Sequence, residues 1–316
     1  MKVLALEGLS SKAIEILNAS NFEVKIVKVA QDQLENYISD NAFDVVILGN
    51  SNEVQQELID ACPSLKILGI YNSNTDHIDI QYAEDNGIQI ISPSEGTANA
   101  IAELVFAHLF GMSRFLHQSN REMPLEGDMN FNLLHRSFSD GVELRGKTLG
   151  IIGFDTIGRE VAKLALGLGM KVIASHNQTN DTIVNVSFYN GQFINIEVET
   201  DTVPEVLKQA DFITIHTENT DSQILGEKEF DTLKKGVGIV NISHSGAIDE
   251  IALVKAIEAK TVQFAGLDFF ENQPTPEIQL LMNPDLSLTP NIGTKTMEAE
   301  ERISVELANK IVKALG

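Results

Sequence analysis

The fold is decided by residues 149–176, LGIIGFDTIGREVAKLALGLGMKVIASH. An apolar run of strand length, residues 149–152, ends at a glycine, and a segment with helical periodicity follows it. A second β-branched run, residues 171–174, closes the unit. The pattern therefore predicts a strand, a helix and a second strand in a parallel βαβ unit.

The turn between the first strand and the helix reads Gly153-Phe154-Asp155-Thr156-Ile157-Gly158. It resembles the dinucleotide fingerprint G-x-G-x-x-G, whose middle glycine lets a pyrophosphate approach the positive end of the helix dipole. Gly153 and Gly158 keep the first and third glycines, but Asp155 places a carboxylate at the middle position. We predict that Asp155 caps the helix beginning near Thr156 or Ile157, where its charge complements the helix dipole. The second strand ends in Ser175-His176-Asn177, where such folds carry an acidic residue for the adenosine ribose. Both marks of NAD recognition are altered within a pattern that still predicts the fold.

The rest of the chain repeats the alternation of strands and helices. Residues 1–98 run from a strand-like MKVLALE to IQIISPS, and the alternation resumes after residue 203, which favours parallel sheets covered by helices. Residues 98–121 predict one long helix, and residues 122–147 are predicted to be irregular. Residues 179–200 are β-prone around a hairpin turn signal at Tyr189-Asn190-Gly191-Gln192.

Composition narrows the classes of partner and compartment. The 316 residues suffice for two ordinary domains, and the net charge of −22 argues against nucleic acid and anionic membranes. Because no apolar run approaches ~18 residues, we expect no membrane span and a cytoplasmic protein. The single cysteine, Cys62, lies in an apolar pattern, which predicts a buried thiol in a reducing compartment.

Several further segments carry a family resemblance: LRGKTLGIIGF, LKQADFITIH, GVGIVNIS, FAGLDFFEN and NPDLSLTP. With the Ile101-Ala102-Glu103-Leu104 start of the long helix, they resemble the D-2-hydroxyacid dehydrogenases, most closely short forms of D-3-phosphoglycerate dehydrogenase. The resemblance runs along almost the whole chain. It implies an α/β fold of two doubly wound parallel-sheet domains. The flavodoxin-like substrate domain would be residues 1–98 plus 285–316, and the inserted Rossmann NAD-type domain residues 99–284.

The resemblance also locates the three catalytic positions of a family that transfers hydride from a 2-hydroxy carbon to NAD. Asn291 replaces the histidine of T-P-H-x-G, Gln273 the glutamate of D-x-F-x-x-E-P, and His244 the arginine of N-x-x-R-G. The amides Asn291 and Gln273 cannot act as a general base or hold a charge near neutral pH. We therefore predict that the three positions are non-functional, although Asn291 and Gln273 could still share a hydrogen bond.

Cofactor and substrate positions follow from the same resemblance. The cofactor positions, where binding is expected to be impaired, are Gly153, Asp155, Thr156, Ile157, Gly158, His176 and His216. No cofactor is expected to be bound tightly, and NAD is implied by the resemblance alone. In the substrate loop, Gly49 stands where related enzymes often carry a phosphate-binding arginine, and Asn72, Ser73, Asn74 and Thr75 replace a glycine-rich sequence.

Three hypotheses about function remain. The first is a pseudoenzyme with a binding or regulatory role, and the second is an active NAD(P)-dependent dehydrogenase with an atypical site. The third is a repurposed enzyme that uses His77, His176, His216 or His244, for which no metal-ligand spacing is present. As partners we expect a second copy of the chain in a homodimer, or an active paralogue in a heterodimer, and neither nucleic acid nor a membrane.

Overall fold

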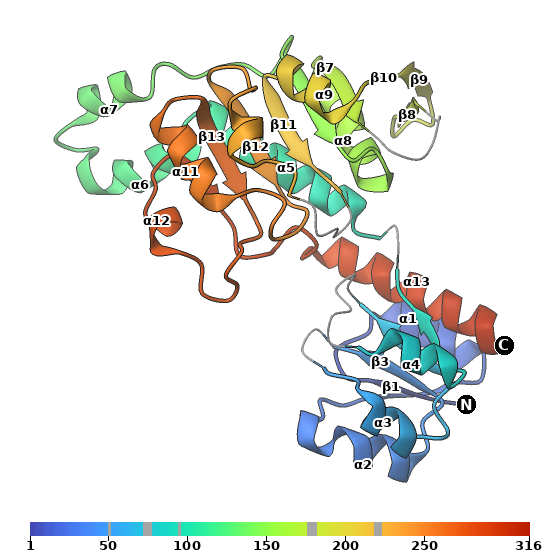
Figure 1. The fold of residues 1–316 in the computed structure, drawn as a ribbon. Helices are drawn as coiled ribbons and strands as arrows, with labels where there is room; N and C mark the ends of the chain where they lie inside the picture. Colours follow the sequence, from blue (N-terminus) through green and yellow to red (C-terminus); the bar gives the residue numbers. More distant parts are fainter. Residues whose placement is uncertain (50–51, 72–77, 94–95, 176–181, 218–222) are drawn as a thin grey trace. The chain divides into compact units, whose positions relative to one another are not determined.

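The computed structural model describes residues 1–49, 52–71, 78–93, 96–175, 182–217 and 223–316 (Figure 1). The chain divides into two compact units. Residues 1–97 and 295–316 form the N-terminal unit, and residues 98–294 form the central unit.

In the described residues, the N-terminal unit contains a five-stranded parallel sheet in the order β2-β1-β3-β4-β5. This is the flavodoxin-like order that the resemblance predicted. The strands are β1 (Lys2–Ala5), β2 (Glu23–Ile26), β3 (Val45–Leu48), β4 (Ile67–Ile70) and β5 (Gln89–Ile91). The helices are α1 (Ser11–Ala19), α2 (Gln31–Asn41), α3 (Gln56–Ala61), α4 (Ile80–Asp85) and the C-terminal α13 (Met297–Leu315). Because α13 packs its apolar face on α1 and β4, the end of the chain belongs to this unit.

The central unit is built on a parallel sheet in the order β10-β7-β6-β11-β12-β13-β14, with seven strands in the described part of the chain. From β10 through β13 this is the Rossmann order 3-2-1-4-5-6, so the predicted fold class is confirmed. The strands are β6 (Thr148–Ile152), β7 (Lys171–Ser175), β10 (Glu199–Thr200), β11 (Phe212–Ile215), β12 (Val237–Asn241), β13 (Val262–Leu267) and β14 (Leu286–Leu288).

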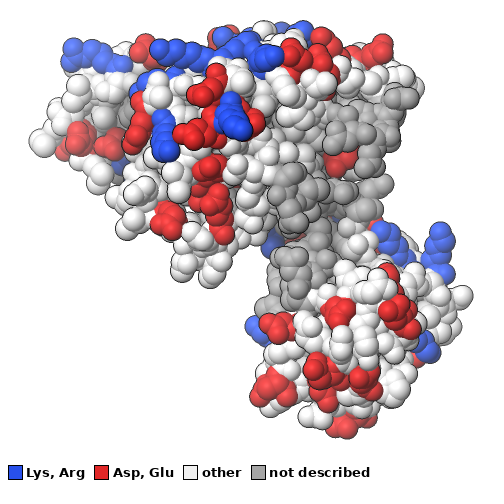
Figure 2. Space-filling model, in the orientation of Figure 1, with Lys and Arg blue, Asp and Glu red and all other residues white. Residues whose placement is uncertain are grey.

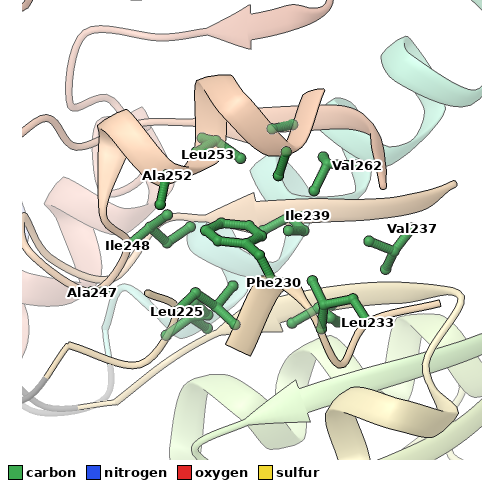
Figure 3. Close-up of a cluster of buried hydrophobic side chains, with 14 of the residues drawn as sticks. Leu225, Phe230, Leu233, Val237, Ile239, Ala247, Ile248, Ala252, Leu253 and Val262 are labelled. Atoms are coloured by element: carbon green, nitrogen blue, oxygen red, sulfur yellow. The ribbon is translucent and has the colours of Figure 1, made fainter. Parts of the chain in front are cut away.

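Helices cover both faces of the central sheet. The helices are α5 (Ala98–Ser113), α6 (Leu116–Glu126), α7 (Phe131–Ser137), α8 (Thr156–Gly167), α9 (Val203–Gln209), α10 (Glu227–Phe230), α11 (Glu250–Glu258) and α12 (Ile278–Leu281). On one face α5 packs against α8 and β13. On the other, Figure 3 shows the ring of Phe230 among aliphatic side chains that include Ile239 and Leu253, which joins α10 and α11 to β12.

The second domain boundary differs from the prediction. Residues 285–294 were assigned to the N-terminal unit, but the structure places them in the central unit. The reason is that β14 pairs with β13, and the backbone N–H groups of Ile292 and Gly293 donate to the carboxylate of Asp268. The chain leaves the central unit only after Thr294.

Two helix predictions are also wrong. The long helix predicted over residues 98–121 is broken at Phe115, which adopts a left-handed conformation with φ of 53°. The ring of Phe115 packs edge-on against Phe264 of β13, at 5.6 Å between centroids. Residues 122–147, predicted to be irregular, contain the end of α6 and the whole of α7.

The predicted hairpin is present in the crossover between β7 and β10. Strands β8 (Ile183–Ser187) and β9 (Phe193–Glu197) pair antiparallel, and Gly191 turns between them with φ of 83°. Val184 of β8 is buried in the core that contains α8, and Arg159 Nη1 of α8 donates to the carbonyl of Ile183 at 3.0 Å. The hairpin therefore lies against the helix that follows the fingerprint turn.

The surface reflects the acidic composition. On the face drawn in Figure 2, the N-terminal unit carries mainly Asp and Glu side chains, while Lys and Arg gather along one border of the central unit.

Cys62 is buried, and burial raises the pKa of its thiol to about 11. Among the described residues, no helix has the length and apolarity that crossing a bilayer requires.

Candidate functional site

The predicted site residues of the central unit gather at the carboxyl edge of its sheet. Since the strands are parallel, their carboxyl ends meet at one edge, where open α/β sheets bind ligands. Gly153 follows β6, His216 follows β11, and the segments with His244, Gln273 and Asn291 follow β12, β13 and β14. His176, which follows β7, lies outside the described residues, as does His77.

The two glycines of the fingerprint turn are required by close approach. Gly153 has φ of 93°, and a Cβ there would lie 2.5 Å from the carbonyl oxygen of His216. At Gly158, a Cβ would lie 2.2 Å from the carbonyl oxygen of Gly153. No larger residue fits either position without moving the backbone, so the turn keeps the tight geometry of a dinucleotide-binding fold.

Asp155 caps the helix that begins at Thr156, as predicted. Its Oδ1 accepts a hydrogen bond from the backbone N–H of Ile157 at 3.2 Å, and its φ of −97° needs no glycine. The carboxylate therefore occupies the positive end of the α8 dipole. The glycines of this turn fit a dinucleotide pyrophosphate, whereas Asp155 does not, because it brings a second anion to the same dipole.

His216 lies at the end of β11 and is only 3% exposed. Its Nε2 is 2.8 Å from the hydroxyl oxygen of Thr214, and its Nδ1 has no hydrogen-bond partner within the described protein. Burial lowers the pKa of His216 to about 3. The ring is therefore neutral at physiological pH.

His244 stands at the family's arginine position and is 7% exposed. Its Nδ1 is 3.0 Å from Ser243 Oγ, and Nε2 is buried with no hydrogen-bond partner in the described protein. Burial lowers its pKa, and a hydrogen bond to the backbone of Thr217 opposes part of the shift. Asn241 fixes the loop, because its side chain accepts from the N–H of Ser243 and donates to the carbonyl of His244.

Gln273 and Asn291 are both exposed. Among the described residues no hydrogen bond joins these two side chains, so the hydrogen bond that they could have shared is absent. Asn291 has φ of 55°, and its backbone N–H donates to the carbonyl of Asp268 at 3.0 Å. The loop after β14 is thus held through its backbone rather than through Asn291's amide.

A buried polar network next to this loop was missed by sequence reasoning. Asp268 is fully buried and accepts from the N–H groups of Ile292 and Gly293 and from Thr289 Oγ1, at 2.5 Å for the hydroxyl. His108 of α5 lies 3.1 Å from Thr289 Oγ1 through Nε2, and burial lowers its pKa to about 4. The available signal was His108 within the otherwise apolar run of residues 104–112.

The substrate-loop positions belong to the N-terminal unit. Asn72, Ser73, Asn74 and Thr75 lie outside the described residues. Gly49 follows β3, and its N–H donates to Asn52 Oδ1 at 2.9 Å. A Cβ at position 49 would lie 2.6 Å from Oε1 of Glu7, so a carboxylate lies directly beside the position where related enzymes often carry arginine.

Within the described ranges, no three His, Cys, Asp or Glu side chains group closely enough to hold a metal ion. The side chains at the sheet edge include imidazoles, amides, hydroxyls and the carboxylate of Asp155.

Comparison with known proteins matches this architecture. The family model described as D-isomer specific 2-hydroxyacid dehydrogenase, NAD binding domain, matches residues 106–293. The hydroxypyruvate reductase of Thermotoga maritima is 35% identical over 98% of this chain and 97% of that protein. The D-3-phosphoglycerate dehydrogenase of Archaeoglobus fulgidus is 33% identical over 99% of this chain, which spans only 57% of that protein's length.

Solved structures agree with the fold. A glyoxylate reductase from Paecilomyes thermophila is 27% identical, with a TM-score of 0.80 over 99% of this chain and 95% of that one. An acyclic imino acid reductase in complex with NADPH and D-Arg is 26% identical, with a TM-score of 0.80 over 100% of this chain and 97% of that one.

Proposed function

The chain belongs to the D-isomer specific 2-hydroxyacid dehydrogenase family, and we propose that it has lost hydride transfer and retains a binding or regulatory role. The observation that carries the proposal is the chemistry of the three catalytic positions. His244, Gln273 and Asn291 all follow strands at one sheet edge, and none of them can perform the family's role at neutral pH.

Hydride transfer in this family needs a base for the hydroxyl proton and a cation for the substrate carboxylate. The amides Gln273 and Asn291 do not titrate. His244 is neutral at physiological pH because burial lowers its pKa, so the arginine's permanent charge is also missing. Catalysis therefore loses its base, the partner of that base and its anchor together.

We also propose that this chain binds NAD more weakly than its active relatives do. Asp155 holds a carboxylate on the N–H of Ile157, where a dinucleotide would place its pyrophosphate. NAD is the cofactor that family membership implies, and we propose that this chain does not hold it tightly. Substrate phosphate groups are disfavoured as well, since Glu7 lies beside Gly49.

A repurposed enzyme is the second candidate, and the free Nε2 of His244 is the observation that favours it. A general base works best when its pKa lies near the operating pH. Because burial lowers the pKa of His244, the imidazole is a weak base, and we favour the binding role.

Turnover tests the proposal directly. The purified chain is mixed with NADH or NADPH and with glyoxylate, hydroxypyruvate or phosphohydroxypyruvate, and absorbance of the reduced nicotinamide is followed. We expect no change above the rate without protein, while the Thermotoga maritima hydroxypyruvate reductase serves as the positive control. An absorbance change proportional to the concentration of the chain would overturn the loss of hydride transfer.

A restored variant locates the defect. His244→Arg, Gln273→Glu and Asn291→His together return the family's catalytic side chains, yet we expect little activity while Asp155 remains. Adding Asp155→Gly to the triple variant should raise the rate further, because the pyrophosphate then meets the α8 N-terminus without a competing carboxylate. Equal rates with and without Asp155→Gly would remove Asp155 from the explanation.

The partners and compartment are proposals of the same kind. We propose a homodimer through the central unit, with a heterodimer containing an active paralogue as the form in which an inactive member could regulate. The acidic net charge of −22 supports a protein with no affinity for nucleic acid. We propose a cytoplasmic protein because its single cysteine, Cys62, is a buried free thiol.

A further inference from the structure

The β8–β9 hairpin exposes apolar side chains on a strongly acidic chain. Residues 182–196 contain no Asp, Glu, Lys or Arg, although 22% of the chain is charged and its net charge is −22. Phe193 is 61% exposed, Ile194 is 54% exposed, and Tyr189 is fully exposed. Figure 1 shows the hairpin at the end of the central unit opposite to α6 and α7. An exposed apolar surface of this kind indicates contact with another molecule.

The two edges of this two-stranded sheet differ. On the outer edge of β8, Arg159 Nη1 donates to the carbonyl of Ile183 at 3.0 Å, and β8 packs against α8. In the described part of the chain, β9 pairs with β8 alone. Its sequence contains neither the lysine nor the proline, and its register has no bulge, by which edge strands usually avoid pairing. The outer edge of β9 is therefore open.

The hydrogen bonds of the hairpin show which backbone groups of β9 point outward. The N–H of Val198 donates to the carbonyl of Thr182 at 2.9 Å, so position 198 faces β8. Residues of an antiparallel pair alternate between bonding to the partner strand and pointing away from it. The N–H and C=O groups of Phe193, Asn195 and Glu197 therefore point away from β8. Among the described residues, these groups have no hydrogen-bond partner.

This edge is complementary to itself. When two β9 strands run antiparallel about a two-fold axis at Asn195, each Asn195 exchanges both backbone hydrogen bonds with its equivalent. Ile194 then lies opposite the partner's Ile196, which covers its exposed side chain. Glu197 lies opposite the partner's Phe193, so no like charges face each other directly.

We propose that two copies of the chain join through the outer edges of β9 to form a four-stranded antiparallel sheet. The charge of the chain favours this place of contact, because acidic surfaces repel within a Debye length of ~8 Å whereas residues 182–196 are uncharged. Five residues a side cover less than the ~1,200 Å² of a stable interface, so the dissociation constant should be about 100 µM. The contact is separate from a dimer through α6 and α7, and it needs no cofactor.

Amide hydrogen exchange of the full chain, measured residue by residue at two protein concentrations, tests the pairing. Exchange at Phe193, Asn195 and Glu197 should be about threefold slower at about 500 µM than at about 10 µM, because most chains are paired only at the higher concentration. Exchange at Ile196, whose N–H faces β8, should change little. Equal exchange at both concentrations, or slowing at Asn185 on the β8 edge instead, would overturn the proposal.

A matched pair of proline variants separates the β9 edge from the fold of the hairpin. Asn195→Pro removes the outward N–H at the centre of the β9 edge, and Asn185→Pro removes the corresponding N–H on β8. Both variants also lose the hydrogen bond from Asn185 Nδ2 to Asn195 Oδ1 at 2.9 Å. Only Asn195→Pro should abolish the slowing at Phe193 and Glu197. An equal loss in Asn185→Pro would refute the role of the β9 edge, and slow exchange at Ile196 establishes that the hairpin forms in each variant.

Side-chain variants and a second probe test the occupant. Ile194→Lys buries a charge opposite the partner's Ile196 and should abolish the slowing. Ile183→Lys, at a β8 side chain that is 53% exposed, is the control and should retain it. Slowing that appears only with phosphatidylcholine vesicles, independent of protein concentration, would assign the hairpin to a lipid surface and overturn the second copy. Since no cofactor or substrate is present, NADH oxidation would defeat the proposed loss of catalysis without affecting this result.

Discussion

At the scale of single residues, Asp155 brings the charge of a side chain into competition with the charge of a cofactor. The positive end of the α8 dipole stabilises anions near the first turn, and the carboxylate of Asp155 already accepts the N–H of Ile157 there. A pyrophosphate must therefore share that dipole with a like charge. The tight glycine turn favours NAD binding, whereas the negative charge of Asp155 disfavours it.

Replacing Asp155 separates these two effects. Asp155→Gly should improve NAD affinity roughly tenfold by removing like-charge repulsion, and should lower stability by a few tenths of a kcal/mol through the lost cap. Asp155→Asn keeps a capping oxygen without charge, so affinity should improve at little cost in stability. Calorimetric titration with NAD and urea unfolding measure the two quantities. Micromolar NAD binding by the unchanged chain would contradict the argument that Asp155 competes with the pyrophosphate for the α8 N-terminus.

The buried histidines predict a loss of stability in acid. Burial lowers the pKa of His108 to about 4 from an ordinary value of 6.5, so the unfolded chain binds more protons below pH 6.5. The contribution of His108 is complete above pH 6.5 and decreases as the pH falls toward 4, by about 1.4 kcal/mol per pH unit. Urea unfolding between pH 7.5 and 5 should show a smaller slope for His108→Gln than for the unchanged chain. His135→Gln, at an exposed site, should keep the original slope, and an unchanged slope in His108→Gln would refute the argument.

The sequence predicted the roles of residues that depend only on their neighbours along the chain. Asp155 was predicted as a cap because its position relative to the apolar run fixes the helix start, and the structure contains that cap. The role of Asp268 was not predicted, because its partners Thr289, Ile292 and Gly293 lie more than twenty residues along the chain. The hydrogen bond from Ser243 Oγ to the carbonyl of Thr217 was not predicted either, because only the folded sheet brings Thr217 next to Ser243.

At the scale of elements, the loop after β14 is attached to β13 by the carboxylate of Asp268. Asp268→Asn leaves one oxygen for three donors and turns an NH₂ group toward them, so the variant should lose about 2–4 kcal/mol of stability. Amide exchange at Ile292 and Gly293 should accelerate more than exchange in β6. Asp201→Asn, at an exposed turn carboxylate, is the matched control. Unchanged protection at Ile292 would mean that the loop is held by other contacts.

The elements themselves were predictable where apolar runs specify them. Strands such as β3, β7 and β12 coincide with apolar runs rich in β-branched residues, and turn chemistry at Asn190-Gly191 identified the β8–β9 hairpin. The break at Phe115 was not predictable, because its partner Phe264 lies on a distant strand and the local helical period continues through it. The shift of the boundary from 285 to 295 has the same origin, since β14 is defined by its pairing with β13.

At the level of the whole molecule, helices α6 and α7 expose several large apolar side chains that a partner could cover. Leu125 is 75% exposed and Met129 is 83% exposed, and the same segment includes the exposed side chains of Leu116, Met123, Phe131 and Leu133. Figure 1 shows α6 and α7 at one end of the central unit, away from the hairpin. So many exposed apolar side chains on two neighbouring helices indicate an interaction surface, which we call the α6–α7 patch.

A second copy of the chain is the expected partner, in a two-fold dimer that buries this patch on both protomers. Light scattering at micromolar concentration should give twice the chain mass, and Leu125→Lys with Met129→Lys should give the monomer, because two charges per protomer would be buried without partners. Ile251→Lys changes an equally exposed apolar side chain on α11, so it should leave the dimer intact. If the unchanged chain already runs as a monomer, or if Ile251→Lys dissociates it as readily, then α6 and α7 are not the interface.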